Sequence, residues 1–320
     1  MLIPRVAMTT ISAGMAVLVA GVVSGQDYPN KPIRIVTAAA GGGSDTIARL
    51  VAQGISGPLG QPVIIENRGT GVIQGEYLSK APPDGYGLLV TGSQFWTTPL
   101  LQKVPYDVVR DFSPISLLSR DTYIVVVHSS MPVKSIKELI ALAKARPGEL
   151  NFGSSAIGGP AHIASELFKS MAGVNIVHVP YKGGAAQLTA LIGGEIHLSI
   201  SDAGAVGPHV KSGKLRALAV TSAEPSALVP ELPTVAVAGL PGYEAAAMTV
   251  MFAPGKTPGA IINRLNQEIV RFLRTTEARE RFLKAGTEVV GSTPEEFAAT
   301  IKSEIAKSSK VIADAGIKTN

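Results

Sequence analysis

The 320-residue chain contains no cysteine. This absence excludes disulfides, thiolate metal sites and cysteine nucleophiles together. A chain of this length can bury a core large enough to fold without disulfide bonds. The missing cysteines therefore exclude several kinds of site but do not indicate a cellular compartment.

Charged and aromatic residues are scarce. Charged residues make up 17% of the chain against 46% hydrophobic residues, a balance that excludes an intrinsically disordered chain. Aromatic residues make up only 5%, and the net charge of +5 is spread without a block of five or six basic residues. Because nucleic-acid-binding surfaces combine a basic stripe with aromatic residues, we expect no nucleic-acid partner. The charge instead favours solubility and a mild attraction for anions.

The motifs of metal binding and catalysis are also missing. No histidine lies four residues from another, and there is no His-Glu-x-x-His pattern. There is no Gly-x-Ser-x-Gly nucleophile elbow and no pair of carboxylates in one loop. The sequence therefore predicts no metal, no cofactor and no catalytic residue, and we do not expect an enzyme. The histidines are His128, His162, His178, His197 and His209.

The N-terminus has the pattern of a secretory signal peptide. Arg5 is its lone charge, and residues 13–23 are all apolar or glycine. That run is shorter than the roughly 20 residues that span a bilayer, but it fits the apolar region of a signal peptide. The small residues Val23, Ser24 and Gly25 suit cleavage, so we expect residues 1–25 to be removed and a periplasmic mature chain to start at Gln26. The alternative is a single membrane anchor.

Short runs rich in valine and isoleucine alternate with helix-length segments from residue 33 to residue 220. This alternation predicts an α/β fold with mostly parallel sheets flanked by helices. The strands are expected at residues 33–36, 63–65, 88–90, 124–127, 150–152, 176–179, 196–200 and 215–220, with helices at 44–55, 135–145, 161–171 and 185–192.

The last third of the chain has a different pattern. One strand is expected at residues 249–253, followed by long amphipathic helices at 257–273 and 294–313. Two sets of α/β units followed by packing helices indicate two lobes. We expect the first lobe to comprise residues 26–123 and 224–320, and the second lobe residues 124–223.

The first glycine loop (residues 38–45, AAAGGGSD) joins the first expected strand to the first helix. Ligands of open α/β sheets bind beyond the carboxyl ends of strands, where helix N-termini offer unpaired amides and a positive dipole end. The loop can therefore accept a carboxylate or phosphate oxygen, whereas the alternative is a simple turn. It is neither a P-loop nor a dinucleotide fingerprint, because no lysine follows Gly43 and Thr46 stands where a small residue is required. We expect Ser44 or Asp45 to cap the helix. The candidate ligand-binding residues here are Ala39, Ala40, Gly41, Gly42, Gly43 and Ser44.

The second glycine loop (residues 153–159, GSSAIGG) has the same design and precedes Pro160, which suits the first position of a helix. Ser154 and Ser155 can offer hydroxyls, and Gly158 and Gly159 can offer amides. His162 either orients this loop or is a packed core residue.

Four further residues end strands or begin connections that should face the same cleft. They are Ser93, Gln94, Tyr181 and Asp202. A structural turn is an equal alternative for Asp202. Trp96 either shapes the cleft or packs in the core, and Lys182 is assigned no role.

An ordered set of short motifs resembles the Bug family, the extracytoplasmic solute-binding receptors of tripartite tricarboxylate transporters. The resemblance runs from Tyr28 to about Lys318. The motifs are residues 28–36 (YPNKPIRIV), 42–45 (GGSD), 66–68 (ENR), 83–86 (PDGY), 105–107 (PYD), 166–168 (ELF), 178–183 (HVPYKG) and 213–221 (GKLRALAVT).

The resemblance implies a two-lobed, type II-like periplasmic binding protein that closes on its ligand. The ligand would be a small organic acid whose carboxylate is held by the two glycine loops. The partners would be the integral membrane subunits of a tripartite tricarboxylate transporter, and we expect a monomer. The first glycine loop departs from the family, since residues 37–40 are TAAA where Pro-Phe is usual. A ligand-binding module for a membrane sensor is the alternative function, and an α/β hydrolase is a further one.

Overall fold

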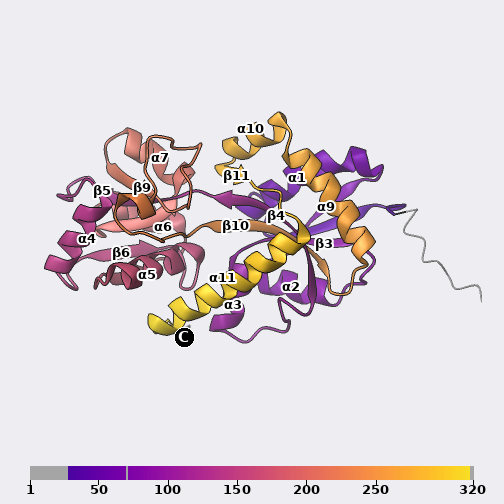
Figure 1. The fold of residues 1–320 in the computed structure, drawn as a ribbon, viewed down its shortest axis with the longest axis horizontal. Coiled ribbons are helices and arrows are strands. Elements are labelled where there is room, and N and C mark those ends of the chain that lie inside the picture. Colours follow the sequence, from indigo (N-terminus) through magenta and orange to yellow (C-terminus); the bar gives the residue numbers. More distant parts are fainter. Residues whose placement is uncertain (1–27, 70, 318–320) are drawn as a thin grey trace, which may run out of the picture.

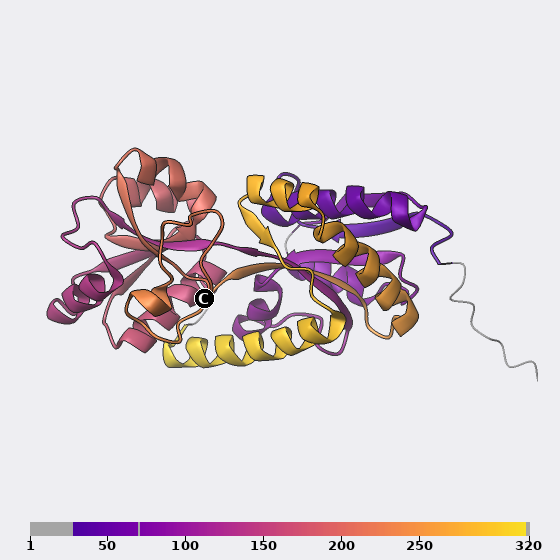
Figure 2. The ribbon, with the colours of Figure 1, turned by 45° about the horizontal axis from the view of Figure 1, so that its top comes forward.

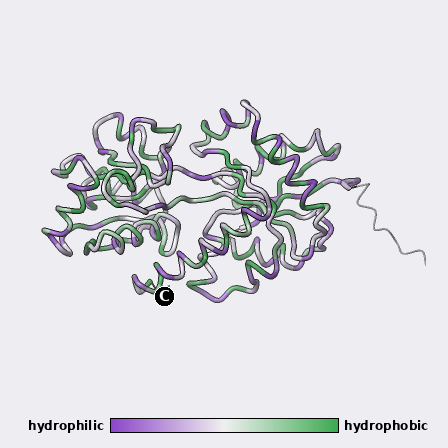
Figure 3. Tube along the Cα trace, in the orientation of Figure 1, coloured by the Kyte–Doolittle hydropathy of each residue, from purple (hydrophilic) through white to green (hydrophobic). Residues whose placement is uncertain are grey.

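The computed structural model describes residues 28–69 and 71–317, which form two lobes side by side, each a sheet flanked by helices (Figure 1). The predicted signal peptide and its cleavage site lie outside the described residues. The two-lobed α/β fold expected from the sequence is confirmed. Figure 3 shows apolar residues along the strands inside each lobe.

The sheet of the first lobe has six strands in the order β11-β4-β10-β3-β1-β2. The strands around β1 are parallel, whereas β10 runs antiparallel to both β3 and β4. The sheet is therefore mixed, and the mostly parallel character that the sequence predicts is limited to the strands around β1. Its strands are β1 (Ile33–Thr37), β2 (Val63–Asn67), β3 (Gly87–Gly92), β4 (Phe112–Asp121), β10 (Ala247–Pro254) and β11 (Thr287–Val289).

Each face of this sheet is covered by its own core. Residues of α1 and α9 pack on one face with Ile33 and Ile35, and α2, α3 and α11 pack on the other with Val36 and Phe252. The helices are α1 (Gly43–Leu59), α2 (Gly71–Ser79), α3 (Gln94–Leu101), α9 (Gly259–Leu273), α10 (Thr276–Lys284) and α11 (Pro294–Asp314).

The second lobe has a five-stranded sheet in the order β7-β6-β8-β5-β9, parallel around β6 and antiparallel on both sides of β5. Its strands are β5 (Tyr123–His128), β6 (Asn151–Ser154), β7 (Val177–Pro180), β8 (Leu198–Asp202) and β9 (Leu215–Val220). Its helices are α4 (Ile136–Ala145), α5 (Pro160–Ala172), α6 (Gly184–Ile192), α7 (Ala203–Lys211) and α8 (Val235–Ala238).

The chain passes between the two sheets twice (Figure 1). The first crossing joins β4 to β5 through Thr122, and the second leads into β10 at Ala247. Residues before the second crossing belong to the core of the second lobe, because Tyr243 is 1% exposed there and the Ala245 N–H donates to the Thr221 oxygen at 2.9 Å. The sequence-based division of the lobes at residues 123 and 224 stays a prediction; in the structure, Val235, Leu240 and Tyr243 pack in the core of the second lobe.

Helix α11 connects the lobes along one side of the molecule (Figure 2). Its start is fixed by a capping box between Thr293 and Glu296, and Phe297 is fully buried in the first-lobe core. Further along, the helix contacts α5 of the second lobe. Any movement between the lobes must therefore be accommodated at the contact between α11 and α5.

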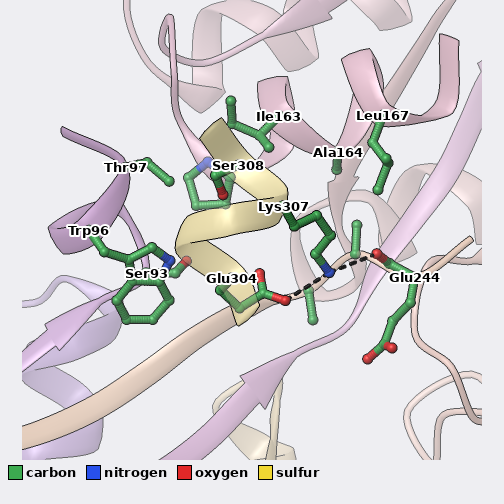
Figure 4. Close-up of a pocket in the computed structure, with 13 residues that line it drawn as sticks. Ser93, Trp96, Thr97, Ile163, Ala164, Leu167, Glu244, Glu304, Lys307 and Ser308 are labelled. Atoms are coloured by element: carbon green, nitrogen blue, oxygen red, sulfur yellow. Dashed lines mark hydrogen bonds and ion pairs between the residues drawn. The ribbon is translucent and has the colours of Figure 1, made fainter. Parts of the chain in front are cut away.

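A small cavity of about 30 Å³ lies where α3, α5 and α11 meet (Figure 4). Lys307 extends across it, with its Nζ 2.7 Å from Glu304 Oε1 and 3.4 Å from the Glu244 carbonyl oxygen. Trp96 lines the same cavity and is 1% exposed, so it packs in the core rather than in an open cleft.

Candidate functional site

The first glycine loop lies at the carboxyl end of β1 and leads directly into α1. Gly42 is the N-cap of α1, and no side chain of the described residues caps the helix there. The expectation that Ser44 or Asp45 caps the helix is therefore wrong. Ala39 and Gly43 are exposed. The amides of Gly43 and Ser44 thus lie at the positive end of the helix dipole, which is an arrangement that attracts anions, whereas the Gly42 N–H donates to the Ala39 oxygen at 3.2 Å.

The buried side chain of Asp45 stabilises the first glycine loop through a hydrogen bond to its backbone. It is 2% exposed, and its carboxylate accepts hydrogen bonds from the Gly41 N–H at 2.9 Å, from Arg49 Nε at 2.9 Å and from Asn67 Nδ2 at 2.8 Å. Gly41 can follow this path because its φ of 81° is favoured by glycine. Burial alone would raise the pKa of Asp45, but the hydrogen bonds from Arg49, Asn67 and Gly41 outweigh burial and lower the pKa to about 2.

Replacing Asp45 by asparagine is expected to destabilise the fold in a pH-dependent way. The pKa of Asp45 falls from 3.8 to about 2 on folding, so its stabilising effect is present above the unfolded value and is lost as the pH falls through the folded value. The difference in unfolding free energy between wild type and D45N should be about 2–3 kcal/mol at pH 7 and should shrink between about pH 5 and pH 2. Urea unfolding at several pH values measures it.

A matched control is Asp314→Asn at the exposed end of α11, where Lys310 Nζ lies 2.6 Å from Asp314 Oδ2. Exposed ion pairs contribute about 0–1 kcal/mol, so this variant should differ little from wild type at any pH. A D45N difference that stays constant from pH 7 to pH 2.5 would contradict the assignment.

In the second glycine loop, the amides of Gly158 and Gly159 form hydrogen bonds with nearby residues of the same lobe. The Gly158 N–H donates to His162 Nδ1 at 2.9 Å, and the Gly159 N–H donates to the Ala156 oxygen at 3.3 Å. In this structure both amides therefore already have partners within the second lobe, and their role in holding a ligand stays a prediction. Ser154 is fully buried, with its Oγ 2.7 Å from His178 Nε2.

The outer part of this loop remains accessible. Ala156 and Ile157 are exposed and Ser155 is half-buried. Pro160 occupies the first turn of α5, as predicted, and Gly159 is an N-cap without a side-chain hydrogen bond. The free donors of this loop are thus expected among residues 155–157 rather than at its two glycines.

A cavity of about 310 Å³ separates the second glycine loop from α2 and α3 of the first lobe. It brings together Gln94, Gly158 and Gly159 from the sequence-predicted set. Thr97 Oγ1 donates to the Gly158 oxygen at 3.3 Å across the lobes. The cavity is lined by Gly71, Val72, Gln94, Thr98, Leu101, Gln102, Ala156, Ile157, Gly158 and Gly159.

The other sequence-predicted residues are not among those that line this cavity. Ser44 lies beside the end of β3, since a Cβ at Gly92 would be 3.9 Å from Ser44 Oγ. Ser93 instead faces the small cavity under α11 (Figure 4), where its buried Oγ has no hydrogen-bond partner among the described residues. Tyr181 packs partly buried beside Gly153.

Asp202 caps α7, with its Oδ1 accepting from the Ala205 N–H at 3.1 Å. It lines a separate cavity of about 570 Å³ between α7 and the turn that leads into β11. Burial raises its pKa above the ordinary value. The turn role that the sequence left open for Asp202 is therefore present in the structure.

Three contacts around the site were not found by sequence reasoning. Thr97 bonds across the lobes, Asn67 reaches Asp45 from β2, and Glu288 of β11 accepts from Thr122 Oγ1 at 3.2 Å and from the Ala227 N–H at 3.1 Å. The only sequence pattern near these contacts is the four-residue spacing of Asp45 and Arg49, which is typical of an ion pair on one face of a helix.

The family model described as the tripartite tricarboxylate transporter family receptor matches residues 47–317. The Bordetella pertussis protein BugT is 35% identical to this chain, over 95% of this chain and 96% of its own length. The chain belongs to the tripartite tricarboxylate transporter receptor family. The resemblance read from the sequence motifs is thus confirmed.

Solved structures agree with this assignment. A Rhodopseudomonas palustris structure described as Rpa4515 with adipate is 37% identical, has a TM-score of 0.76 and covers 91% of this chain and 99% of its own. MatC from the same organism, with bound malate, is 28% identical, with a TM-score of 0.71 over 89% of this chain and all of its own. A ligand-free TctC solute-binding protein from Polaromonas is 25% identical, with a TM-score of 0.80 over 90% and 99% of the two chains.

Members of the family are solute-binding receptors of the periplasm, and this receptor has the same two-lobed fold. Helices long and apolar enough to cross a membrane do not occur among residues 28–69 and 71–317.

Proposed function

We propose that this receptor is exported to the periplasm, binds a small organic carboxylate between its lobes and delivers it to the integral membrane subunits of a tripartite tricarboxylate transporter. The observation that carries the proposal is the uncapped start of α1, exposed behind the first glycine loop. Relatives of 37% and 28% identity that are described with adipate and malate support a carboxylate as the ligand.

The ligand carboxylate is held mainly by backbone amides rather than by a cationic side chain. Gly43 and Ser44 supply donors from the first lobe, together with Ala39 and Ala40, and residues 155–157 supply donors from the second. Hydrogen bonds to a charged group contribute roughly 1.5–3 kcal/mol each. Micromolar affinity requires about 8 kcal/mol. Several such bonds made from both lobes suffice for it.

The body of the ligand occupies the cavity beside the second glycine loop. None of the lining residues is charged. Val72, Leu101 and Ile157 supply apolar surface, whereas Gln94 and Gln102 can form hydrogen bonds with a distal polar group. We therefore propose a ligand with a short apolar chain and a carboxylate at one or both ends.

Ligand binding brings the lobes together by rotation at the two crossings. We place the second of these at residues 245–247, because the chain as far as Ala245 is hydrogen-bonded to the second lobe. The receptor acts as a monomer, and its mature form begins at or near Gln26.

A thermal-shift screen of mono-, di- and tricarboxylates tests the function. A ligand present at 100 times its dissociation constant should add about 2.7 kcal/mol to the unfolding free energy. Linear dicarboxylates such as adipate should give the largest shifts, and matched diamines and sugars should give none. Stabilisation by a sugar or an amine, with none from any carboxylate, would overturn the proposal.

A further inference from the structure

Two stacked imidazoles lie directly beneath the second glycine loop. The rings of His162 on α5 and His178 on β7 have centroids 3.9 Å apart with an interplanar angle of 18°. His178 stacks on Phe152 as well, with a centroid distance of 4.7 Å. His162 is 3% exposed, so it cannot meet a ligand from the cleft without a rearrangement of the loop.

The hydrogen bond from Gly158 defines which ring nitrogen of His162 carries the proton. A backbone N–H can only donate, so His162 Nδ1, which accepts from the Gly158 N–H at 2.9 Å, is unprotonated. Its Nε2 then carries the proton and faces Glu166 Oε1 at 3.7 Å. The Glu166 carboxylate thus lies on the side of the His162 ring opposite Gly158 and favours this orientation of the imidazole.

His178 contacts the first part of the same loop through Ser154. Ser154 Oγ lies 2.7 Å from His178 Nε2 and 3.3 Å from the Ala156 oxygen. The shorter hydrogen bond joins Ser154 to the ring, and the hydroxyl can serve as its donor or its acceptor. Burial, followed by the neighbouring His162, lowers the pKa of His178 to about 4, so this ring stays neutral near pH 7.

We propose that His162 and His178 are positioning residues that fix the second glycine loop in its ligand-binding shape before the ligand arrives. This rests on the proposed function, because that loop is the second-lobe half of the carboxylate site. The two rings anchor Ser154 and Gly158 from below and leave residues 155–157 facing outward. A loop that is already ordered avoids the entropy loss of ordering upon binding, and this preorganisation raises affinity.

The proposal differs from a purely packing role because it depends on one hydrogen bond made by each ring rather than on ring volume. His162→Asn keeps an acceptor close to the position of Nδ1, and His162→Leu removes it. His178→Gln keeps a hydrogen-bonding group close to the position of Nε2, and His178→Phe keeps the stacking but removes that group. Each pair therefore separates hydrogen bonding from burial.

The experiment combines two measurements on the four variants. Hydrogen exchange of the Gly158 amide in ligand-free protein, followed by NMR, should be at least about tenfold faster in H162L than in wild type and should be largely restored in H162N. The affinity for adipate, measured by calorimetry, should fall about tenfold in H162L and H178F and should stay within about threefold in H162N and H178Q.

Equal affinity losses in H162N and H162L, or no loss in either, would overturn the proposal. If adipate does not bind the wild-type receptor, that result counts against the proposed ligand class alone, and the exchange measurement decides the positioning role. Unchanged Gly158 protection in H162L would then reject it.

Discussion

Replacing Gly43 by aspartate is expected to lower the affinity for the carboxylate ligand at least about 100-fold, equivalent to about 2.7 kcal/mol, without unfolding the protein. Gly43 is the first residue of α1, and a Cβ there would meet nothing within 4 Å. An aspartate at this position suits the helix dipole and should change stability by no more than about 1 kcal/mol. Its carboxylate would nevertheless compete with the ligand for the same amides and repel it.

Gly43→Asn is the matched control, because it has nearly the same shape but no charge. It should lose much less affinity than G43D, and both variants should unfold near the wild-type temperature. Calorimetry with the best ligand of the thermal-shift screen provides the comparison. Wild-type affinity in the G43D variant would mean that the carboxylate lies elsewhere.

Phe297→Ala is expected to lower the unfolding free energy by about 3–5 kcal/mol, the range for removing a large buried aromatic side chain. Phe297 is fully buried, and its ring centroid lies 5.0 Å from that of Phe252. Phe252 in turn contacts Phe95 and Phe112, so the substitution opens a cavity in the core that anchors α11 to the first lobe.

Lys302→Ala on the same helix is the control for loss of a side chain at an exposed position. It should change the unfolding free energy by less than about 0.5 kcal/mol. Urea unfolding followed by circular dichroism measures both variants. A loss below about 1 kcal/mol in F297A would show that α11 is not anchored through this cluster.

The parallel α/β units were predictable because local pattern and tertiary role agree in them. The apolar run around Ile35 forms β1, and the periodic residues Ile47, Val51 and Ile55 form the buried face of α1. Helices α3 and α7 were missed because their sequences oppose helix formation. Pro99 lies inside α3, and Pro208 inside α7. There, packing between layers outweighs local propensity.

The positions of the glycine loops were also predictable, since a strand, a glycine-rich turn and a helix follow one another in the sequence. Which amides remain free was not predictable. It depends on which side chains accept hydrogen bonds from the loops. His162 accepts one from the Gly158 N–H, and Asp45 accepts one from the Gly41 N–H. The position of the Ser93 side chain was not predictable either. Helix α3 begins directly after Ser93, and the side chain lies toward α11 rather than in the cleft.

The central claim is that one carboxylate ligand contacts both lobes through backbone amides. The most direct measurement is an amide NMR titration of the labelled receptor with the carboxylate that gives the largest thermal shift. We predict that the amides of Gly43 and Ser44 in the first lobe and of residues 155–157 in the second lobe shift together, along one saturation curve. Shifts confined to one lobe, or centred on residues away from the two glycine loops, would contradict the claim.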